Sequence, residues 1–375
     1  MPAFEQPLHV GRPNLAQRDR FLELAGGVFD RGWFTNNGPL VQELEQRIAD
    51  FVGVRNVVAM CNGTIALEVA VRAIGLAGEV IVPSFTFVAT AHALHWHGIT
   101  PVFADIDPET HNLDPDSVRA LITPRTTGII GVHLWGRSAP VKELQAIADE
   151  HGLQLIFDAA HAFGCSSNGE MVGNFGRAEV LSFHATKFFS TFEGGAVVTD
   201  DDELADTMRL MRNFGFAGVD NVVHPGTNAK LTEVCAAMGI ANLESIDETV
   251  EVNRRNHAAY ARALRGIPGI SLITYDEQAR NNHQYVVITV DPESPVGRDA
   301  LVEALHAENV LARRYFWPGA HRMEPYRTLF PDAGRVLPHT ERVAEQVVVL
   351  PTGPAVSEAD IDVVAGIIRR TLATA

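Results

Sequence analysis

Six short apolar runs recur between residues 78 and 201, and they constrain the fold more than any other feature of the sequence. Segments with helical spacing, such as VKELQAIADEHG, lie between several of them. The runs are GEVIVPS (78–84), TPVFADI (100–106), TTGIIGVH (126–133), LQLIFDAA (153–160), AEVLSFHA (178–185) and GAVVTDD (195–201). Short apolar strands that alternate with helices are typical of an α/β fold with a mainly parallel sheet and helices on its faces. Only a loop separates the last two runs, which allows one of those strands to run antiparallel.

The pattern changes from Thr232 onward. Helical spacing continues from Thr232 to Gly266, and a helix of that length usually bridges two domains. Beyond it, HQYVVITV and QVVVLPT read as strands and GRDALVEALHAENV reads as a helix. We therefore predict a large α/β domain over residues 1–245 and a small C-terminal α+β domain over residues 246–375.

Charge and cysteine content argue against several classes of function. The formal net charge is -16 at pH 7, so nucleic acid and anionic membranes are poor partners. Cys61, Cys165 and Cys235 are far apart, which argues against a disulfide framework and a zinc site and suits a reducing cytoplasm. The N-terminal residues lack the pattern of a signal peptide, and no apolar run is long enough to span a membrane. We expect a cytoplasmic protein without a metal.

A single lysine, Lys187, stands in the stretch SFHATKFFSTFEGG (182–195), which otherwise reads as buried strand and turn. A buried ammonium group is costly unless it is paired or loses its charge. One way to remove the basicity of a buried amine is to make the amine a reactant. Lys187 is therefore a candidate catalytic residue, and a surface lysine with an extended side chain is the alternative.

Two further places could bind a flat, anionic ligand. Gly63 and Thr64 follow Asn62 at the start of a helical run, where free backbone N–H groups can bind an anion. Phe85 and Phe87 follow a strand, and an aromatic ring there could stack on a cofactor. An ordinary helix cap and a core aromatic are the structural alternatives.

Asp158 ends a probable parallel strand, and His161 follows three residues later. Ligands of open α/β sheets bind at the carboxyl ends of the strands. A carboxylate there can hold a protonated ring nitrogen, and an imidazole can donate to a nearby oxygen. A helix cap and a core histidine are the alternatives for these two residues.

Taken together, these groups meet the needs of pyridoxal 5′-phosphate. Its aldehyde requires an amine such as Lys187, and its ring nitrogen requires a carboxylate such as Asp158. Its phosphate requires a helix N-terminus and hydroxyl groups, which the start of the run at Gly63 and the strand-end Ser182 provide.

The chain resembles the DegT family of nucleotide-sugar aminotransferases, which belong to the fold-type-I pyridoxal phosphate enzymes. The matching motifs follow the family's order and cover most of the chain. They are WFTNNGPLVQELE, NGTIAL, VPSFTFVATAHAL, PVFADIDPETHNLDP, VHLWG, DAAHAFG, SFHATKFFSTFEGGAVVTDD, GTNAKLTEVCAAMG and RRYFWPGAHRMEPYR. This resemblance implies a large domain with a seven-stranded type of sheet and a homodimer with shared active sites.

The resemblance also assigns roles to individual residues. Lys187 matches the Schiff-base lysine, Asp158 the partner of the pyridine nitrogen, His161 the neighbour of the ring hydroxyl and Phe87 the stacking aromatic. The phosphate site is matched by Gly63, Thr64 and Ser182, and by Asn228, which corresponds to an asparagine that reaches the neighbouring subunit's phosphate. The sequence departs from the family at Phe188, Phe189, Phe192 and Lys230, and we expect these changes to touch the cofactor's surroundings and the substrate side.

The implied reaction moves an amino group from L-glutamate to a nucleotide-linked keto sugar. We expect dTDP-4-keto-6-deoxyglucose, aminated at C4. The segment that contains Arg313, Arg314, Tyr315 and His321 is the candidate for the sugar-nucleotide pocket, because cations and aromatic rings suit a diphosphate and a base. A solvated surface loop is the alternative.

Other functions on the same fold stay open. They are a C3 aminotransferase of a dTDP-3-keto-6-deoxyhexose, a pyridoxal-phosphate-dependent sugar dehydratase and a non-catalytic regulator. The dehydratase branch carries a histidine at the position of Lys187, so the lysine in this chain argues against a dehydratase. No basic patch or DNA-binding segment supports the regulator.

Overall fold

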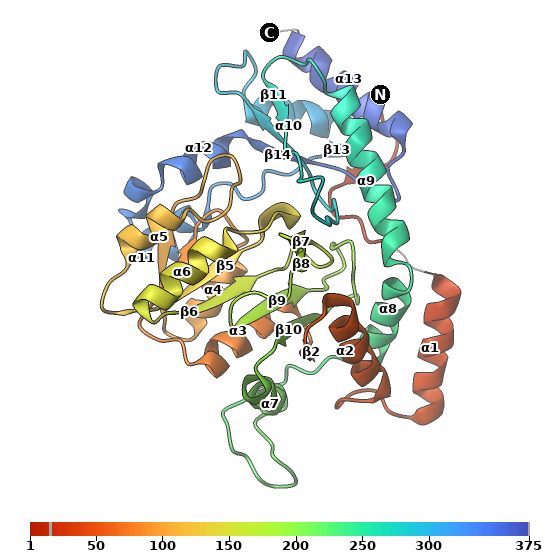
Figure 1. Ribbon diagram of the computed structural model, residues 1–375. Coiled ribbons are helices and arrows are strands. Elements are labelled where there is room, and N and C mark those ends of the chain that lie inside the picture. The colour runs from red at the N-terminus through yellow and green to blue at the C-terminus, as the bar shows by residue number, and fades with distance from the viewer. Residues whose placement is uncertain (15–16, 374–375) are drawn as a thin grey trace.

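A seven-stranded sheet forms the centre of the region predicted as the large domain (Figure 1). The computed structural model describes residues 1–14 and 17–373, and this sheet lies within them. In spatial order its strands are β2 (Asn56–Met60), β10 (Gly195–Thr199), β9 (Ala178–Ser182), β6 (Gln154–Asp158), β5 (Thr126–Val132), β3 (Glu79–Pro83) and β4 (Thr100–Ala104). β10 is antiparallel to both neighbours, and the other pairs are parallel. The predicted α/β class is confirmed, and β2 is a strand that was not among the six predicted runs.

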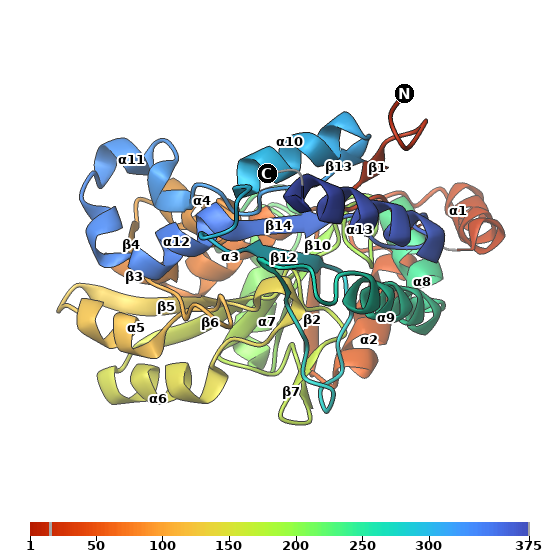
Figure 2. The same ribbon diagram turned by 90° about the horizontal axis from the view of Figure 1, so that it is seen from above.

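Alternate residues of the strands face two separate apolar cores. In β6, Leu155 and Phe157 pack into one core, whereas Ile156 packs into the other. The first core is covered by α1 (Arg18–Arg31), α2 (Pro39–Val52), α5 (Pro115–Leu121), α6 (Val141–His151) and α8 (Glu233–Leu243). The second is covered by α3 (Gly63–Ile74), α4 (Ala89–Trp96) and α7 (Asp202–Met211). Figure 2 shows α5 and α6 on the opposite side of the sheet from α3 and α4.

The small domain contains a three-stranded antiparallel sheet in the order β11 (Ile270–Leu272), β12 (Val286–Val290), β14 (Val347–Leu350). Its outer face is covered by α9 (Ile246–Ala263), α10 (Arg298–Ala307) and α13 (Glu358–Ala373). Shorter elements are β1 (Leu8–His9), η1 (Leu134–Gly136), β7 (Ser166–Ser167), β8 (Glu170–Met171), β13 (Val310–Leu311), η2 (Ala320–Arg322), α11 (Tyr326–Leu329), η3 (Ala333–Val336) and α12 (Pro338–Gln346). β1 pairs with β13, so the first residues of the chain lie against its C-terminal part. Among the described helices, none has the length and apolar character needed to cross a membrane.

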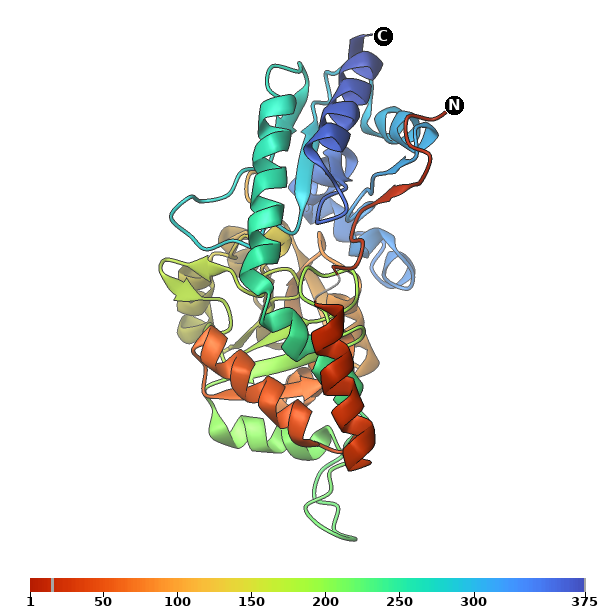
Figure 3. The ribbon, with the colours of Figure 1, turned by 90° about the vertical axis from the view of Figure 1, so that its right-hand side faces the viewer.

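The continuous helix predicted from Thr232 to Gly266 is wrong, because the structure interrupts it between α8 and α9. Ser245 at the junction has φ -120° and ψ 18°, outside the helical range. Its hydroxyl lies 3.5 Å from the carbonyl oxygen of Ala241 and 3.4 Å from that of Asn242. A side chain that bonds to these carbonyls competes with the helical backbone. After the break, α9 leads from α8, which covers the large sheet, to the small sheet (Figure 3).

The inner face of the small sheet packs onto one edge of the large sheet. Val287 and Val349 of the small domain share an apolar cluster with Phe85, Val132 and Trp135, which follow or end strands of the large domain. The carboxyl ends of the parallel strands therefore face the small domain, at the place where α/β sheets bind ligands.

Candidate active site

A cavity of about 560 Å³ lies at this carboxyl edge of the large sheet. It brings together residues that are as much as 254 positions apart in sequence, since both Asn62 and Phe316 line it. Seven of the residues predicted to hold a cofactor are in its wall: Gly63, Thr64, Phe87, Asp158, His161, Ser182 and Lys187. Of the predicted substrate residues, Tyr315 also lines it.

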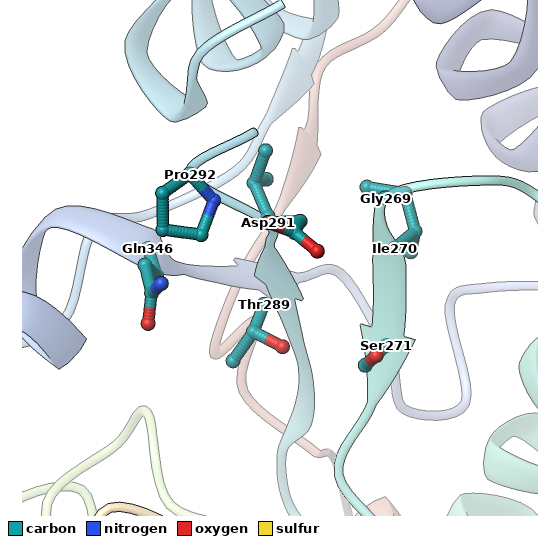
Figure 4. A pocket seen from close by; sticks show the side chains of 8 residues that line it. Gly269, Ile270, Ser271, Thr289, Asp291, Pro292 and Gln346 are labelled. Atoms are coloured by element: carbon teal, nitrogen blue, oxygen red, sulfur yellow. The ribbon is translucent and has the colours of Figure 1, made fainter. Parts of the chain in front are cut away.

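A second cavity, of about 280 Å³, lies in the small domain beside β11 and β12 (Figure 4). Its polar side chains are Ser271, Thr289, Asp291 and Gln346, and no residue predicted for the site lines it. A pocket without a basic group offers little to an anionic cofactor, so the larger cavity is the candidate active site.

One end of the larger cavity forms a cup for an anion at the start of α3. The Asn62 side chain caps this helix by accepting a hydrogen bond from the Ile65 amide at 2.8 Å. The amides of Gly63 and Thr64, in the first turn, have no partner within the helix and can bind a ligand. A Cβ atom on Gly63 would lie only 2.9 Å from Cβ of Ser182, so glycine permits the close approach of β9. Neutral donors thus surround the cup, which fits a phosphate group.

Asp158 is held in place by two hydrogen bonds at the end of β6. Its Oδ2 accepts one from the Thr90 hydroxyl at 2.9 Å, and its Oδ1 accepts one from the Ala160 amide at 3.1 Å. The Thr90 hydroxyl also lies 3.1 Å from that of Thr86. The sequence analysis missed both threonines, of which Thr90 lies in the first turn of α4 and Thr86 precedes the helix.

His161 is buried and is fixed by aromatic neighbours. Its ring lies 5.9 Å from that of Trp135 and 5.8 Å from that of Phe316, between centroids, and these two rings also stack on each other at 5.4 Å. Its Nδ1 accepts a hydrogen bond from the Trp135 amide at 3.4 Å, which assigns the proton to Nε2. Burial lowers the pKa of His161 well below its ordinary value, and the nearby Lys187 charge adds to this effect. The residue is therefore a neutral donor through Nε2.

Lys187 lies in the turn after β9 and donates a hydrogen bond from Nζ to the Tyr285 hydroxyl at 3.2 Å. Burial lowers the pKa of Lys187 to about 8, although Asp158 opposes the change. The chain has three lysines, and the others are Lys142 and Lys230. A lysine with this lowered pKa provides a neutral amine near physiological pH, which suits both a nucleophile and a base.

The Phe87 ring is 57% exposed although it lies in the cavity wall. A large exposed aromatic in a concave site is typical of a surface that a flat ligand covers. An anion cup, a fixed carboxylate, a neutral imidazole donor, an amine of lowered pKa and this ring form a donor set that fits pyridoxal phosphate.

Three residues predicted for the substrate pocket, Arg313, Arg314 and His321, lie outside the cavity wall. Arg313 places its guanidinium 5.0 Å from the centroid of the Tyr315 ring. His321 is only 2% exposed, and it lies between the Ser84 hydroxyl, 2.7 Å from Nδ1, and the Glu341 carboxylate, 3.1 Å from Nε2. Substrate contact by Arg313 and His321 stays a prediction.

Asn228 is exposed on the loop between α7 and α8 and forms a bridge with Asn213. On the same loop Lys230 donates to the Asn213 side chain at 3.2 Å, and its ammonium lies 4.6 Å from the Phe214 ring centroid. Neither Asn228 nor Lys230 reaches the cavity of its own chain. Their predicted roles therefore depend on a second copy of the chain.

The expectation that the phenylalanines after Lys187 touch the cofactor's surroundings is wrong for two of them. Phe188 and Phe189 are 5% and 2% exposed and pack against Phe163, behind the loop. Phe192 is 40% exposed and contacts the Phe21 ring. Phe188 and Phe189 belong to the first apolar core, so these two departures from the family fill that core.

Sequence and structure comparisons agree with one another. The DegT/DnrJ/EryC1/StrS aminotransferase family model matches residues 16–369. The chain is 38% identical over 367 residues to the dTDP-4-amino-4,6-dideoxy-D-glucose transaminase of Shigella dysenteriae, covering 97% of this chain and 99% of that one. It is 35% identical over 348 residues to the transaminase of the same name from Escherichia coli, covering 92% and 94%. The crystal structure of DesI in the presence of its TDP-sugar product is 52% identical with a TM-score of 0.95, covering 99% of this chain and 94% of DesI.

Proposed function

Because the chain belongs to the DegT/DnrJ/EryC1/StrS aminotransferase family, we propose that it uses pyridoxal phosphate to transfer the amino group of L-glutamate to C4 of dTDP-4-keto-6-deoxyglucose. The observation that carries this proposal is one cavity in which Lys187, Asp158 and His161 face an anion cup. The names of two transaminase relatives and the TDP-sugar of DesI support the choice of substrate.

The cavity residues divide the work of holding the cofactor. The amides of Gly63 and Thr64 and the Ser182 hydroxyl would bind its phosphate. Asp158 would keep the ring nitrogen protonated, and His161 would donate a hydrogen bond from its Nε2–H to the oxygen of the ring hydroxyl. When bound, the cofactor supplies a protonated ring that accepts the electron pair left on carbon when a C–H bond breaks.

Lys187 moves the proton in the proposed reaction. Its neutral Nζ would take the proton from the α-carbon of the amino donor. The protonated amine would then release that proton on the same side of the cavity. The pKa of about 8 keeps a substantial fraction of the amine neutral near that pH, which is the condition for a general base.

The cavity of one chain carries too little positive charge for the proposed substrates. L-glutamate has two carboxylates and the nucleotide sugar has a diphosphate, yet Lys187 is the only lysine or arginine among the described residues that line the cavity. The loop that carries Asn228 and Lys230 is exposed and apolar at its tip, where Val219 is 92% and Val222 57% exposed. Figure 1 shows this loop projecting beyond α7. These features support a homodimer in which the loop completes the partner's site.

Mixing two inactive variants is expected to restore activity if Asn228 serves the partner's cofactor phosphate. Asn228→Asp places negative charge against the phosphate, and Lys187→Ala removes the amine. After subunit exchange, each hybrid dimer holds one doubly damaged site and one intact site. Turnover should then rise well above the sum of the two parents. Activity that stays at that sum, with exchange verified by mass spectrometry of tagged subunits, would place Asn228 in its own subunit or away from the cofactor.

A substrate panel tests the proposed function directly. Purified protein is incubated with L-glutamate and the dTDP-, UDP- and GDP-linked 4-keto-6-deoxy sugars, and product is followed by mass spectrometry. We expect amination of the dTDP sugar, with nitrogen at C4 by nuclear magnetic resonance. Nitrogen at C3 of a 3-keto sugar would favour the C3 aminotransferase, and loss of a hydroxyl without amination would favour the dehydratase. No turnover of any sugar would contradict the proposal.

A further inference from the structure

We propose that Tyr285 is a further catalytic residue, whose phenolic oxygen accepts a hydrogen bond from Lys187 Nζ and directs the lone pair of the free amine into the cavity. This role rests on the proposed function, because it assigns to Tyr285 the control of the proposed base. It concerns a residue that the sequence analysis read only as the start of a strand.

The position of Tyr285 is set by its surroundings and not by Lys187 alone. Its side chain is buried, with 7% exposed, and lines the cavity. The ring lies 4.6 Å from that of His161 and 5.3 Å from that of Trp135, between centroids. The hydroxyl is then 3.2 Å from Lys187 Nζ.

The residues just before Tyr285 tie the small domain to three loops of the large domain. Each hydrogen bond joins a polar side chain of this segment to a backbone group in a loop of the large domain. The bonds are Asn281 Nδ2 to Gly136 O at 2.9 Å, Asn282 Nδ2 to His161 O at 2.9 Å and to Phe163 O at 3.1 Å, and the Phe188 amide to Gln284 Oε1 at 3.3 Å. Because the last of these holds the residue next to Lys187, the amine and the phenol are fixed relative to each other. Preorganised partners of this kind are what a positioned base requires.

The chemistry of the pair is that of a neutral acceptor beside an amine. Burial raises the pKa of Tyr285, so the phenol stays protonated and does not take up the proton that Lys187 moves. A hydrogen bond from an ammonium group is stronger than one from a neutral amine. Tyr285 therefore stabilises the charged form of Lys187 and limits how far burial lowers its pKa. Removing the hydroxyl should lower that pKa further.

Competitive labelling of the cofactor-free, full-length chain tests this inference without any turnover. A trace amine-reactive reagent is added between pH 6 and pH 11, and labelling of each lysine peptide is quantified by mass spectrometry. Exposed Lys142 serves as the internal reference within the same chain. The Lys187 midpoint should lie near pH 8 in the parent protein. In Tyr285→Phe it should fall by about half to one pH unit.

Tyr315→Phe is the matched control, because Tyr315 also lines the cavity but no hydrogen bond of its hydroxyl to Lys187 occurs in the described structure. It should leave the Lys187 midpoint unchanged. Tyr285→Phe keeps the ring that packs on His161, so the fold should persist, as circular dichroism would show. Its kcat should drop by about ten- to a hundredfold with little change in KM.

A lower melting temperature with an unchanged Lys187 midpoint would overturn the inference and make Tyr285 a structural residue. An unchanged midpoint with normal stability would overturn it too. Since the labelling uses no substrate, a shifted midpoint supports the pair even if the sugar panel fails. The two proposals can therefore fail separately.

Discussion

Lys187→Ala is expected to reduce turnover by about 10⁴-fold or more while the protein stays folded. The substitution removes both the amine that binds the cofactor and the base that moves the proton. It also removes an amine whose charged form is disfavoured by burial, as the lowered pKa of about 8 indicates. The melting temperature should therefore not fall. Steady-state rates with L-glutamate and the keto sugar measure the effect, and thermal unfolding monitors stability.

Lys142→Ala is the matched control, because Lys142 is an exposed lysine on α6 and takes no part in the cavity. Its turnover should equal that of the parent. Borohydride reduction followed by peptide mapping should attach the cofactor to the Lys187 peptide and not to those of Lys142 or Lys230. A Lys187→Ala protein with a near-normal rate would contradict the assignment of Lys187 as the lysine that binds the cofactor. Attachment of the cofactor to another lysine would contradict it too.

The sequence pattern predicted the large sheet because each strand is apolar on both faces. A strand such as β6 contacts both cores, so its run is continuous and bounded by turn residues. β2 has the same character, since all five of its residues are buried, and a wider scan would have found it. The break between α8 and α9 carried a weaker signal, Ser245 three residues before Glu248, which is the spacing of a helix N-terminus. No glycine or proline marks it, and the bonds of Ser245 that accompany it appear only in the fold.

The site could be predicted where its residues occupy fixed places on the fold. Asp158 and Ser182 end strands and Gly63 begins a helix, so local sequence positions them at one edge of the sheet. Tyr285 could not be found in this way. It reaches the cavity through packing between the two domains, in an apolar cluster with Trp135 and other residues distant in sequence. His321 was chosen for its residue type alone. It forms a hydrogen bond with Ser84 in the buried interior, and its contact with substrate stays a prediction.

Asp158→Asn is expected to lower turnover by about 10²- to 10³-fold with little change in stability, the size of effect seen when one preorganised electrostatic partner is lost. The amide has no charge with which to keep the ring nitrogen protonated, so electron withdrawal by the cofactor weakens. The fold tolerates the change because the amide oxygen can still accept from the Ala160 amide. The Thr90 hydroxyl, 3.1 Å from that of Thr86, can turn toward it instead of toward residue 158.

Asp105→Asn separates this electrostatic role from a structural one. Asp105 also follows a parallel strand, β4, and is 4% exposed, but its two carboxylate oxygens accept from the His339 and Thr340 amides at 2.9 and 2.7 Å. Its loss should weaken the cap of α12 by about 1–2 kcal/mol and lower the melting temperature, with little effect on the rate per folded molecule. Asp158→Asn should show the opposite pattern, because its carboxylate faces the cavity. If Asp158→Asn instead lowers the melting temperature while turnover per folded molecule stays normal, Asp158 is a cap like Asp105. The cavity then lacks the carboxylate that the proposed chemistry requires.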